Sequence, residues 1–125
     1  AFDINLEVYI EPENVEPTLV SKSNFKYMYW SMSQQLAHHT SNGCRVNSGD
    51  MMGSGTISGS SPDSFGSMLE LTWSGKNPIL MNDNTERKFI NDNDTVIMIG
   101  YCENKEVRIG FGEVRNKLLP PFVRK

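Results

Sequence analysis

FDINLEVYI, residues 2–10, alternates apolar and polar side chains along its length. The apolar residues stand at every second position: Phe2, Ile4, Leu6, Val8 and Ile10. A period of two is typical of a β-strand that buries one face. Glu11-Pro12-Glu13 follows and ends the strand, because proline cannot donate to a sheet ladder. The stretch therefore predicts a fold that is rich in β-structure.

Short strands are predicted for much of the remaining chain, with turns rich in Gly, Asn and Asp between them. A glycine-rich strand is expected from Met51 onward. Further strands are expected at residues 67–73, 77–81, 88–90, 95–102 and 107–111. The residues between the first strand and Ser23 are interpreted as a polar connection.

One helix is predicted, because apolar residues recur at helical spacing at Phe25, Met28, Met32 and Leu36. Ser23 or Asn24 is expected to cap its start, and Asn42-Gly43 provides a left-handed stop. The expected fold class is mainly β with one long helix packed on it. A length of 125 residues fits a single domain.

The charges exclude some classes of protein. Twelve basic and fifteen acidic residues are scattered along the chain and give a net charge of -3, which argues against a nucleic-acid surface. No apolar run approaches the roughly 20 residues that cross a bilayer, so no membrane partner is expected.

Cys44 and Cys102 are isolated and indicate reduced thiols of a cytosolic protein, with a single disulfide as the alternative.

Glu70 is a candidate site residue, because it interrupts the apolar run Met68-Leu69-Glu70-Leu71. A buried carboxylate costs several kcal/mol unless it is paired or protonated. One interpretation is a carboxylate that points into a site. The other is a strand residue that alternation sends to water.

Thr56 is a second candidate, because it stands in the glycine-rich run Gly53-Ser54-Gly55-Thr56-Ile57-Ser58-Gly59. Glycines let a backbone approach a ligand closely, but a tight barrel corner has the same pattern.

The pair His38-His39 is interpreted as structural, and Glu11, Glu13 and residues 91–94 lack the spacing of metal ligands. No metal ligand is assigned to the chain.

Longer strings carry a family resemblance across nearly the whole chain. They include Phe2-Asp3-Ile4-Asn5-Leu6, Ser23-Asn24-Phe25-Lys26-Tyr27-Met28-Tyr29-Trp30, Gly55-Thr56-Ile57-Ser58-Gly59, Phe65-Gly66-Ser67-Met68-Leu69-Glu70-Leu71 and Arg108-Ile109-Gly110-Phe111-Gly112. In this order they resemble the C-terminal part of the fumarylacetoacetase (fumarylacetoacetate hydrolase) family. The expected domain assignment is that residues 1–125 form the C-terminal portion of one catalytic domain.

The resemblance implies a hydrolase that cleaves a carbon–carbon bond of fumarylacetoacetate to fumarate and acetoacetate, the last step of tyrosine and phenylalanine breakdown. It implies a cytoplasmic homodimer, a mixed β-sandwich roll, a small dicarbonyl acid substrate, and a Ca²⁺ or Mg²⁺ ion. The family's catalytic glutamate, which pairs with a water-activating histidine, matches Glu70. Its substrate-contacting threonine matches Thr56.

Nothing in the chain matches the family's catalytic histidine, its acidic metal ligands or its small SH3-like domain, all of which lie upstream. The sequence, which begins in strand pattern directly after Ala1, is therefore interpreted as the later part of a longer protein. We expect this part alone to be inactive. The alternatives are a related metal-dependent dicarbonyl-acid hydrolase or decarboxylase, and a non-catalytic binding module on the same scaffold.

Overall fold

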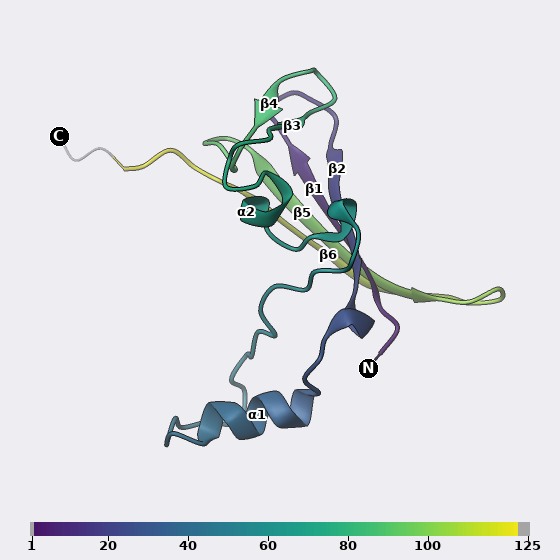
Figure 1. The fold of residues 1–125 in the computed structure, drawn as a ribbon, viewed down its shortest axis with the longest axis vertical. Helices are drawn as coiled ribbons and strands as arrows, with labels where there is room; N and C mark the ends of the chain where they lie inside the picture. The colour runs from purple at the N-terminus through teal and green to yellow at the C-terminus, as the bar shows by residue number, and fades with distance from the viewer. Residues whose placement is uncertain (1, 123–125) are drawn as a thin grey trace.

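The computed structural model describes residues 2–122 (Figure 1). A sheet of four antiparallel strands forms its centre, in the order β2-β1-β5-β6. The strands of this sheet are β1 (Asn5–Glu11), β2 (Thr18–Asn24), β5 (Thr95–Glu103) and β6 (Arg108–Lys117). The other elements are 3₁₀ turns η1 (Phe25–Tyr27) and η2 (Pro62–Ser64), helices α1 (Met32–Thr40) and α2 (Met68–Leu71), and the hairpin of β3 (Ile79–Leu80) and β4 (Glu86–Arg87). The prediction of a mainly β fold is confirmed.

The alternation in residues 2–10 sets the register of the central sheet. Leu6 lies opposite Gly100, and Val8 lies opposite Met98 on β5. Since paired residues of an antiparallel sheet share a face, these side chains point to one side, and Glu7 and Tyr9 point to the other. The predicted first strand is confirmed from Asn5 to Ile10.

The core lies on the face that carries Val8 and Ile10, where α2 and the hairpin cover the sheet (Figure 1). Its buried centre consists of Ile10, Val20 and Met81. Val20 reaches the core because the pairing of β1 with β2 shifts register between Val8 and Tyr9, which leaves an extra residue on β2. Partly buried apolar residues pack around this centre: Val8, Met68, Ile79 and Ile90.

A buried ion pair joins the hairpin to the start of β5. Arg87 Nε donates to Asp94 Oδ2 at 2.8 Å, and Arg87 Nη2 donates to Asp94 Oδ1 at 2.9 Å. The backbone N–H of Asn91 also donates to Asp94 Oδ2 at 2.9 Å. The hydrogen bond with Asp94 raises the pKa of Arg87, so the guanidinium stays charged. The acidic turn at residues 91–94 therefore has a structural role.

The predicted helix is confirmed only from Met32 onward. Asn24 ends β2 and caps the short η1, since its side chain accepts a hydrogen bond from Lys26 N at 2.9 Å. Helix α1 begins at Met32, and its N-cap Ser31 forms a capping box with Gln34. Figure 1 shows α1 at the end of an arm that extends away from the sheet, so the expected packing of this helix on the sheet is wrong.

The prediction missed β2, whose sequence TLVSKSN was interpreted as a polar connection. Ser21 and Ser23 are polar but buried, so the apolar signal of a half-buried strand is weak there. The predicted strand at 67–73 is wrong, because Ser67 caps the helix α2. The predicted glycine-rich strand from Met51 is also wrong, because no strand forms between Thr40 and Ile79.

The later strand predictions are closer to the structure. The strand at 95–102 is confirmed, and the strand at 107–111 is confirmed but extends to Lys117. Only Ile79–Leu80 pairs within 77–81, and Glu86–Arg87 pairs in place of 88–90.

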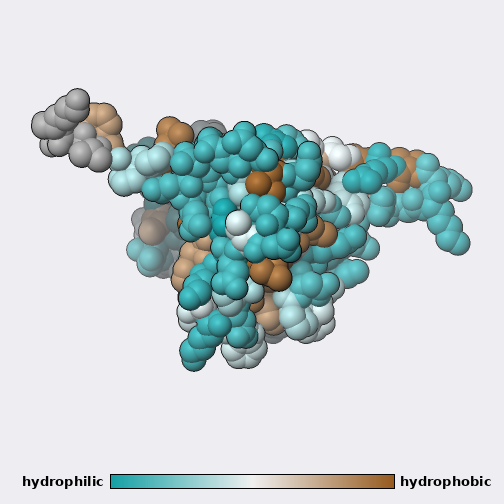
Figure 2. Space-filling view, turned by 90° about the horizontal axis from the view of Figure 1, so that it is seen from above, coloured by the Kyte–Doolittle hydropathy of each residue, from teal (hydrophilic) through white to brown (hydrophobic). Residues whose placement is uncertain are grey.

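No helix within the described part of the chain is long and apolar enough to cross a membrane. Seen from above, the surface is mostly hydrophilic with apolar residues in separate patches (Figure 2).

Candidate functional site

The loop of residues 55–59, which carries Thr56, is fixed to the edge strand β2. Ser23 Oγ donates to the carbonyl oxygen of Ile57 at 2.9 Å. Ser21 Oγ donates to the carbonyl oxygen of Phe65 at 2.6 Å, where the chain returns from η2. Both serines are buried. Two hydroxyls of β2 therefore hold the segment between Thr56 and Glu70 at Ile57 and at Phe65.

Glycine is required where the chain passes back over the 55–59 loop. A Cβ atom at Gly66 would lie 2.7 Å from the carbonyl oxygen of Ile57 and 2.7 Å from Thr56 Cγ2. Gly55 has a φ of +80°, a conformation that favours glycine. These two positions explain why Thr56 is bordered by glycines in sequence and in space.

The Glu70 carboxylate accepts hydrogen bonds from two serines. Ser58 Oγ lies 2.9 Å from Oε1 and 3.0 Å from Oε2 of Glu70. Ser67 Oγ donates to Glu70 Oε2 at 2.7 Å and also accepts from Glu70 N at 3.3 Å. The hydroxyl of Ser58 in turn accepts the backbone N–H of Gly66 at 3.0 Å. Glu70 is thus linked to the loop that carries Thr56.

The surroundings of Glu70 contradict the interpretation of this residue as part of a strand. The residue lies in the first turn of α2 rather than in a strand, and it is exposed among the described residues. The apolar run misled because periodicity cannot separate a strand from a helix over so few residues. The hydroxyls of Ser58 and Ser67, and not alternation in a strand, hold the side chain.

Thr56 is exposed and lines a cavity of about 380 Å³ on the central sheet. Apolar side chains form much of the cavity wall: Leu6, Val8, Met98, Phe111 and Val114. Gly66 also lines the cavity, beside Thr56. The glycine-rich run therefore borders a cavity whose wall is largely apolar.

The model of the family described as fumarylacetoacetate (FAA) hydrolase C-terminal matches residues 3–119. The chain belongs to this family. The fumarylacetoacetase of Homo sapiens is 52% identical over 123 residues, which is 98% of this chain and 29% of that protein. The enzyme of Dictyostelium discoideum is 52% identical over 127 residues, 99% of the chain and 30% of the relative.

The fumarylacetoacetase of Caenorhabditis elegans is 51% identical over 119 residues, 94% of the chain and 28% of that protein. The chain therefore spans about three tenths of the length of these relatives, and the region it matches is C-terminal in the family model. The family predicted from the sequence is confirmed. The roles of Thr56 and Glu70 within it stay predictions.

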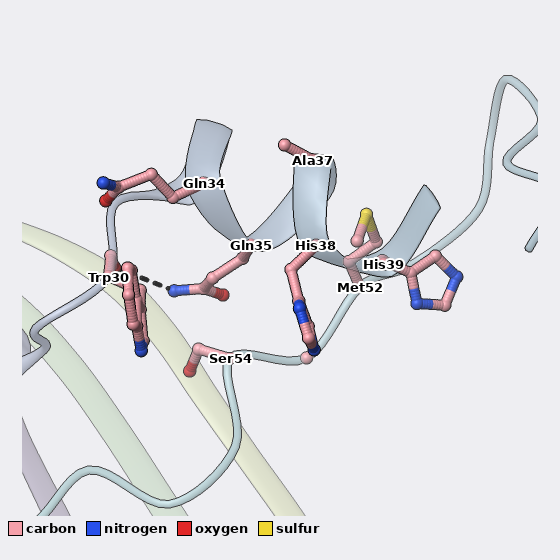
Figure 3. Close-up of a pocket in the computed structure, with 9 residues that line it drawn as sticks. Trp30, Gln34, Gln35, Ala37, His38, His39, Met52 and Ser54 are labelled. Carbon is pink, nitrogen blue, oxygen red and sulfur yellow. Dashed lines mark hydrogen bonds between the residues drawn. The ribbon is translucent and has the colours of Figure 1, made fainter. Parts of the chain in front are cut away.

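A cavity of about 520 Å³ lies in the arm that carries α1 (Figure 3). His38 and His39 line this cavity together with Trp30 and, from the segment opposite the helix, Met52 and Ser54. Gln35 Nε2 donates to the carbonyl oxygen of Trp30 at 3.1 Å across one end. Neither Thr56 nor Glu70 lines this cavity, so the two histidines are not part of the site described above.

The family resemblance implies a divalent cation, which needs several oxygen or nitrogen ligands in one place. Within these residues no group of three or more His, Cys, Asp or Glu side chains could hold a metal ion. The carboxylate of Glu70 is surrounded by hydroxyl donors rather than by other acidic ligands. The described residues therefore do not form a metal site by themselves.

A second group of polar side chains surrounds the carboxylate of Glu7, on the sheet face opposite the 55–59 loop. It was not predicted from the sequence. Glu7 accepts hydrogen bonds from the hydroxyls of Tyr9 at 2.8 Å and Tyr101 at 3.0 Å, and Lys22 Nζ lies 3.5 Å away. Burial raises the pKa of Glu7, but these hydrogen bonds and the charge of Lys22 outweigh burial and hold the pKa below its ordinary value. The sequence contained one sign of this cluster. Glu7 and Tyr9 stand two residues apart, a spacing that places both side chains on the same face of a strand.

Proposed function

We propose that the protein containing this chain hydrolyses a carbon–carbon bond of fumarylacetoacetate, yielding fumarate and acetoacetate, the last step of tyrosine and phenylalanine breakdown. The observation that carries the proposal is similarity along nearly the whole chain to proteins named fumarylacetoacetase, with identities between 45% and 52%. Both residues predicted from the family resemblance, Thr56 and Glu70, are connected through one loop.

In this proposal Glu70 accepts a ring N–H of the histidine that activates water. Such a contact fixes the tautomer of the imidazole and stabilises the imidazolium that forms. An ionised carboxylate offers about four acceptor positions. Ser58 and Ser67 supply donors to two of them, which leaves capacity for an imidazole N–H. The exposure of Glu70 among the described residues leaves room for that histidine, which we place upstream in the longer protein.

Thr56 binds an oxygen of the substrate in this proposal. Its side chain is exposed, and its hydroxyl makes no hydrogen bond within residues 2–122. Gly55 and Gly66 let the substrate and the returning chain come close to it. The carboxylate and carbonyl oxygens of a small dicarbonyl acid are acceptors that such a hydroxyl would bind.

The proposal includes a Ca²⁺ or Mg²⁺ ion, whose ligands we place outside the described residues. When bound, the ion would polarise the substrate oxygens and stabilise the negative charge that develops on them. Residues 1–125 would form the C-terminal portion of one catalytic domain, a mixed β-sandwich roll, with the SH3-like domain upstream. That assignment includes Ala1 and residues 123–125, which lie outside the described part of the chain.

We further propose a cytoplasmic homodimer with a small-molecule substrate and neither nucleic acid nor membrane as a partner. Cys44 and Cys102 are free thiols in the structure, which supports a reducing compartment. Every residue of β6 is exposed, and apolar side chains remain uncovered on and beside this strand, among them Met98, Ile109, Phe111 and Val114. Further protein, from the rest of the chain or from a second copy, would cover such a surface.

A spectrophotometric assay of the full-length protein tests the proposed function. Purified protein with added Mg²⁺ or Ca²⁺ should hydrolyse fumarylacetoacetate with a kcat on the order of 1 to 1,000 per second. A chelator should abolish turnover, and returning the ion should restore it. A folded, metal-loaded protein that leaves fumarylacetoacetate intact would contradict the proposal. Turnover of another dicarbonyl acid alone would favour the related hydrolase.

A further inference from the structure

Ser58 joins two parts of the site that are separate in sequence. It belongs to the 55–59 loop with Thr56, and its hydroxyl reaches Glu70, twelve residues away on α2. Ser67, the other donor to Glu70, is the cap of the same helix and therefore belongs to the local structure of α2. Within residues 2–122, Ser58 is the residue of the 55–59 loop whose side chain hydrogen-bonds to the carboxylate.

The hydrogen bonds around Ser58 fix the direction of its hydroxyl hydrogen. The backbone N–H of Gly66 donates to Ser58 Oγ at 3.0 Å and thus occupies an acceptor position of the hydroxyl. The single hydroxyl hydrogen then faces the carboxylate, whose two oxygens lie at 2.9 and 3.0 Å. Hydrogen bonds with an ionised partner are stronger than neutral ones, so this contact restrains the carboxylate.

The backbone beside Ser58 is itself held by the sheet. The preceding residue, Ile57, accepts the hydroxyl of the buried Ser23 through its carbonyl oxygen at 2.9 Å. Two hydrogen bonds, joined by the peptide bond between Ile57 and Ser58, therefore connect β2 to the carboxylate of Glu70. A site held in this way keeps its acceptor oriented before any substrate arrives.

From these contacts we infer that Ser58 is a positioning residue that orients the Glu70 carboxylate toward the histidine of the proposed hydrolysis. The inference rests on the proposed function. Ser58 need not touch the substrate, because it acts through Glu70. Its removal should therefore lower kcat with little change in KM, and the loss should depend on an intact carboxylate at position 70.

The experiment is a double-mutant cycle in the full-length protein, with fumarylacetoacetate as substrate. Ser58→Ala should lower kcat about tenfold and leave KM within about twofold. In the Glu70→Gln background the same change should alter kcat less than about twofold, because no charged carboxylate remains to be oriented. Ser60→Ala is the matched control, since Ser60 is exposed in the same segment and makes no side-chain hydrogen bond among residues 2–122.

Circular dichroism and the thermal midpoint establish whether each variant folds. If Ser58→Ala does not fold, Ser58→Cys keeps the volume with a much weaker donor, and its kcat should also fall. A kcat within about twofold of wild type in a folded Ser58 variant would overturn the inference alone. An equal loss in both backgrounds would also overturn it, because that result indicates a structural role for the loop. A wild-type protein without turnover would overturn the proposed function and, with it, the inference.

Discussion

Ser23, buried on the edge strand β2, donates its hydroxyl to the carbonyl oxygen of Ile57 at 2.9 Å. The contact connects residues 34 positions apart in the chain. It satisfies a backbone acceptor next to Thr56 and fixes the glycine-rich loop to the central sheet. The loop therefore has a defined position although it contains no helix or strand of its own.

Gly66→Ala tests how closely the chain packs on this loop. The added Cβ would lie 2.7 Å from the carbonyl oxygen of Ile57 and 2.9 Å from its backbone nitrogen, so the backbone must move. We expect the free energy of unfolding to fall by about 1 to 3 kcal/mol. Urea denaturation of the full-length protein measures it. Gly53→Ala is the control, because nothing lies within 4 Å of a Cβ there. Equal stability of the two variants would mean that the close approach is absent.

Thr56→Val tests the proposed substrate contact. The change keeps the shape of the side chain and removes the hydroxyl, which is exposed over the apolar cavity. We expect kcat/KM for fumarylacetoacetate to fall by roughly ten- to a hundredfold, a loss of about 1 to 3 kcal/mol in transition-state binding. The thermal midpoint should stay close to that of wild type. An unchanged kcat/KM in a folded variant would return Thr56 to a structural role.

Tyr101→Phe tests the Glu7 cluster through its pH dependence. The folded-state pKa of Glu7 is lowered from its ordinary value of 4.5, so the stabilisation that Glu7 provides is fully present above that value and is lost as pH falls through the folded pKa. The variant lacks one hydroxyl that donates to Glu7. It should be less stable than wild type by about 1 kcal/mol at pH 7.

The difference in stability between wild type and Tyr101→Phe should shrink as pH falls below the unfolded pKa of Glu7. Thermal midpoints of both proteins at a series of pH values measure this difference. Tyr29→Phe serves as the control, because Tyr29 is exposed on the arm and its hydroxyl makes no hydrogen bond within the described residues. A difference that stays constant with pH would show that Tyr101 acts independently of the carboxylate.

The sequence was informative where side chains alternate clearly. β1 was predicted because its apolar residues alternate, whereas β5 was predicted from a short apolar run between turn residues. β2 was missed because Ser21 and Ser23 occupy buried positions, which they can do only through hydrogen bonds to Phe65 and Ile57. No local pattern encodes such long-range partners.

The site was only partly predictable, because its hydrogen bonds also join residues that are distant in sequence. The family resemblance singled out Thr56 and Glu70, but the short run around Glu70 was assigned to a strand, whereas it forms the helix α2. The link through Ser58 was not predicted, because it depends on the fold bringing the loop and α2 together. Composition and motif indicate which side chains carry chemistry, and tertiary contacts decide how they are held.

Glu70→Gln tests the central claim most directly. The variant keeps the size of the side chain and an acceptor for Ser58 and Ser67 but removes the charge that would orient and stabilise the imidazolium. The measurement is kcat for fumarylacetoacetate in the full-length, metal-loaded protein, with Glu106→Gln, at an exposed residue of the β5–β6 turn, as the control. We expect kcat to fall by roughly two to four orders of magnitude while the free energy of unfolding changes by less than about 1 kcal/mol. A kcat near that of wild type in the folded variant would contradict the assignment of Glu70 to the active site.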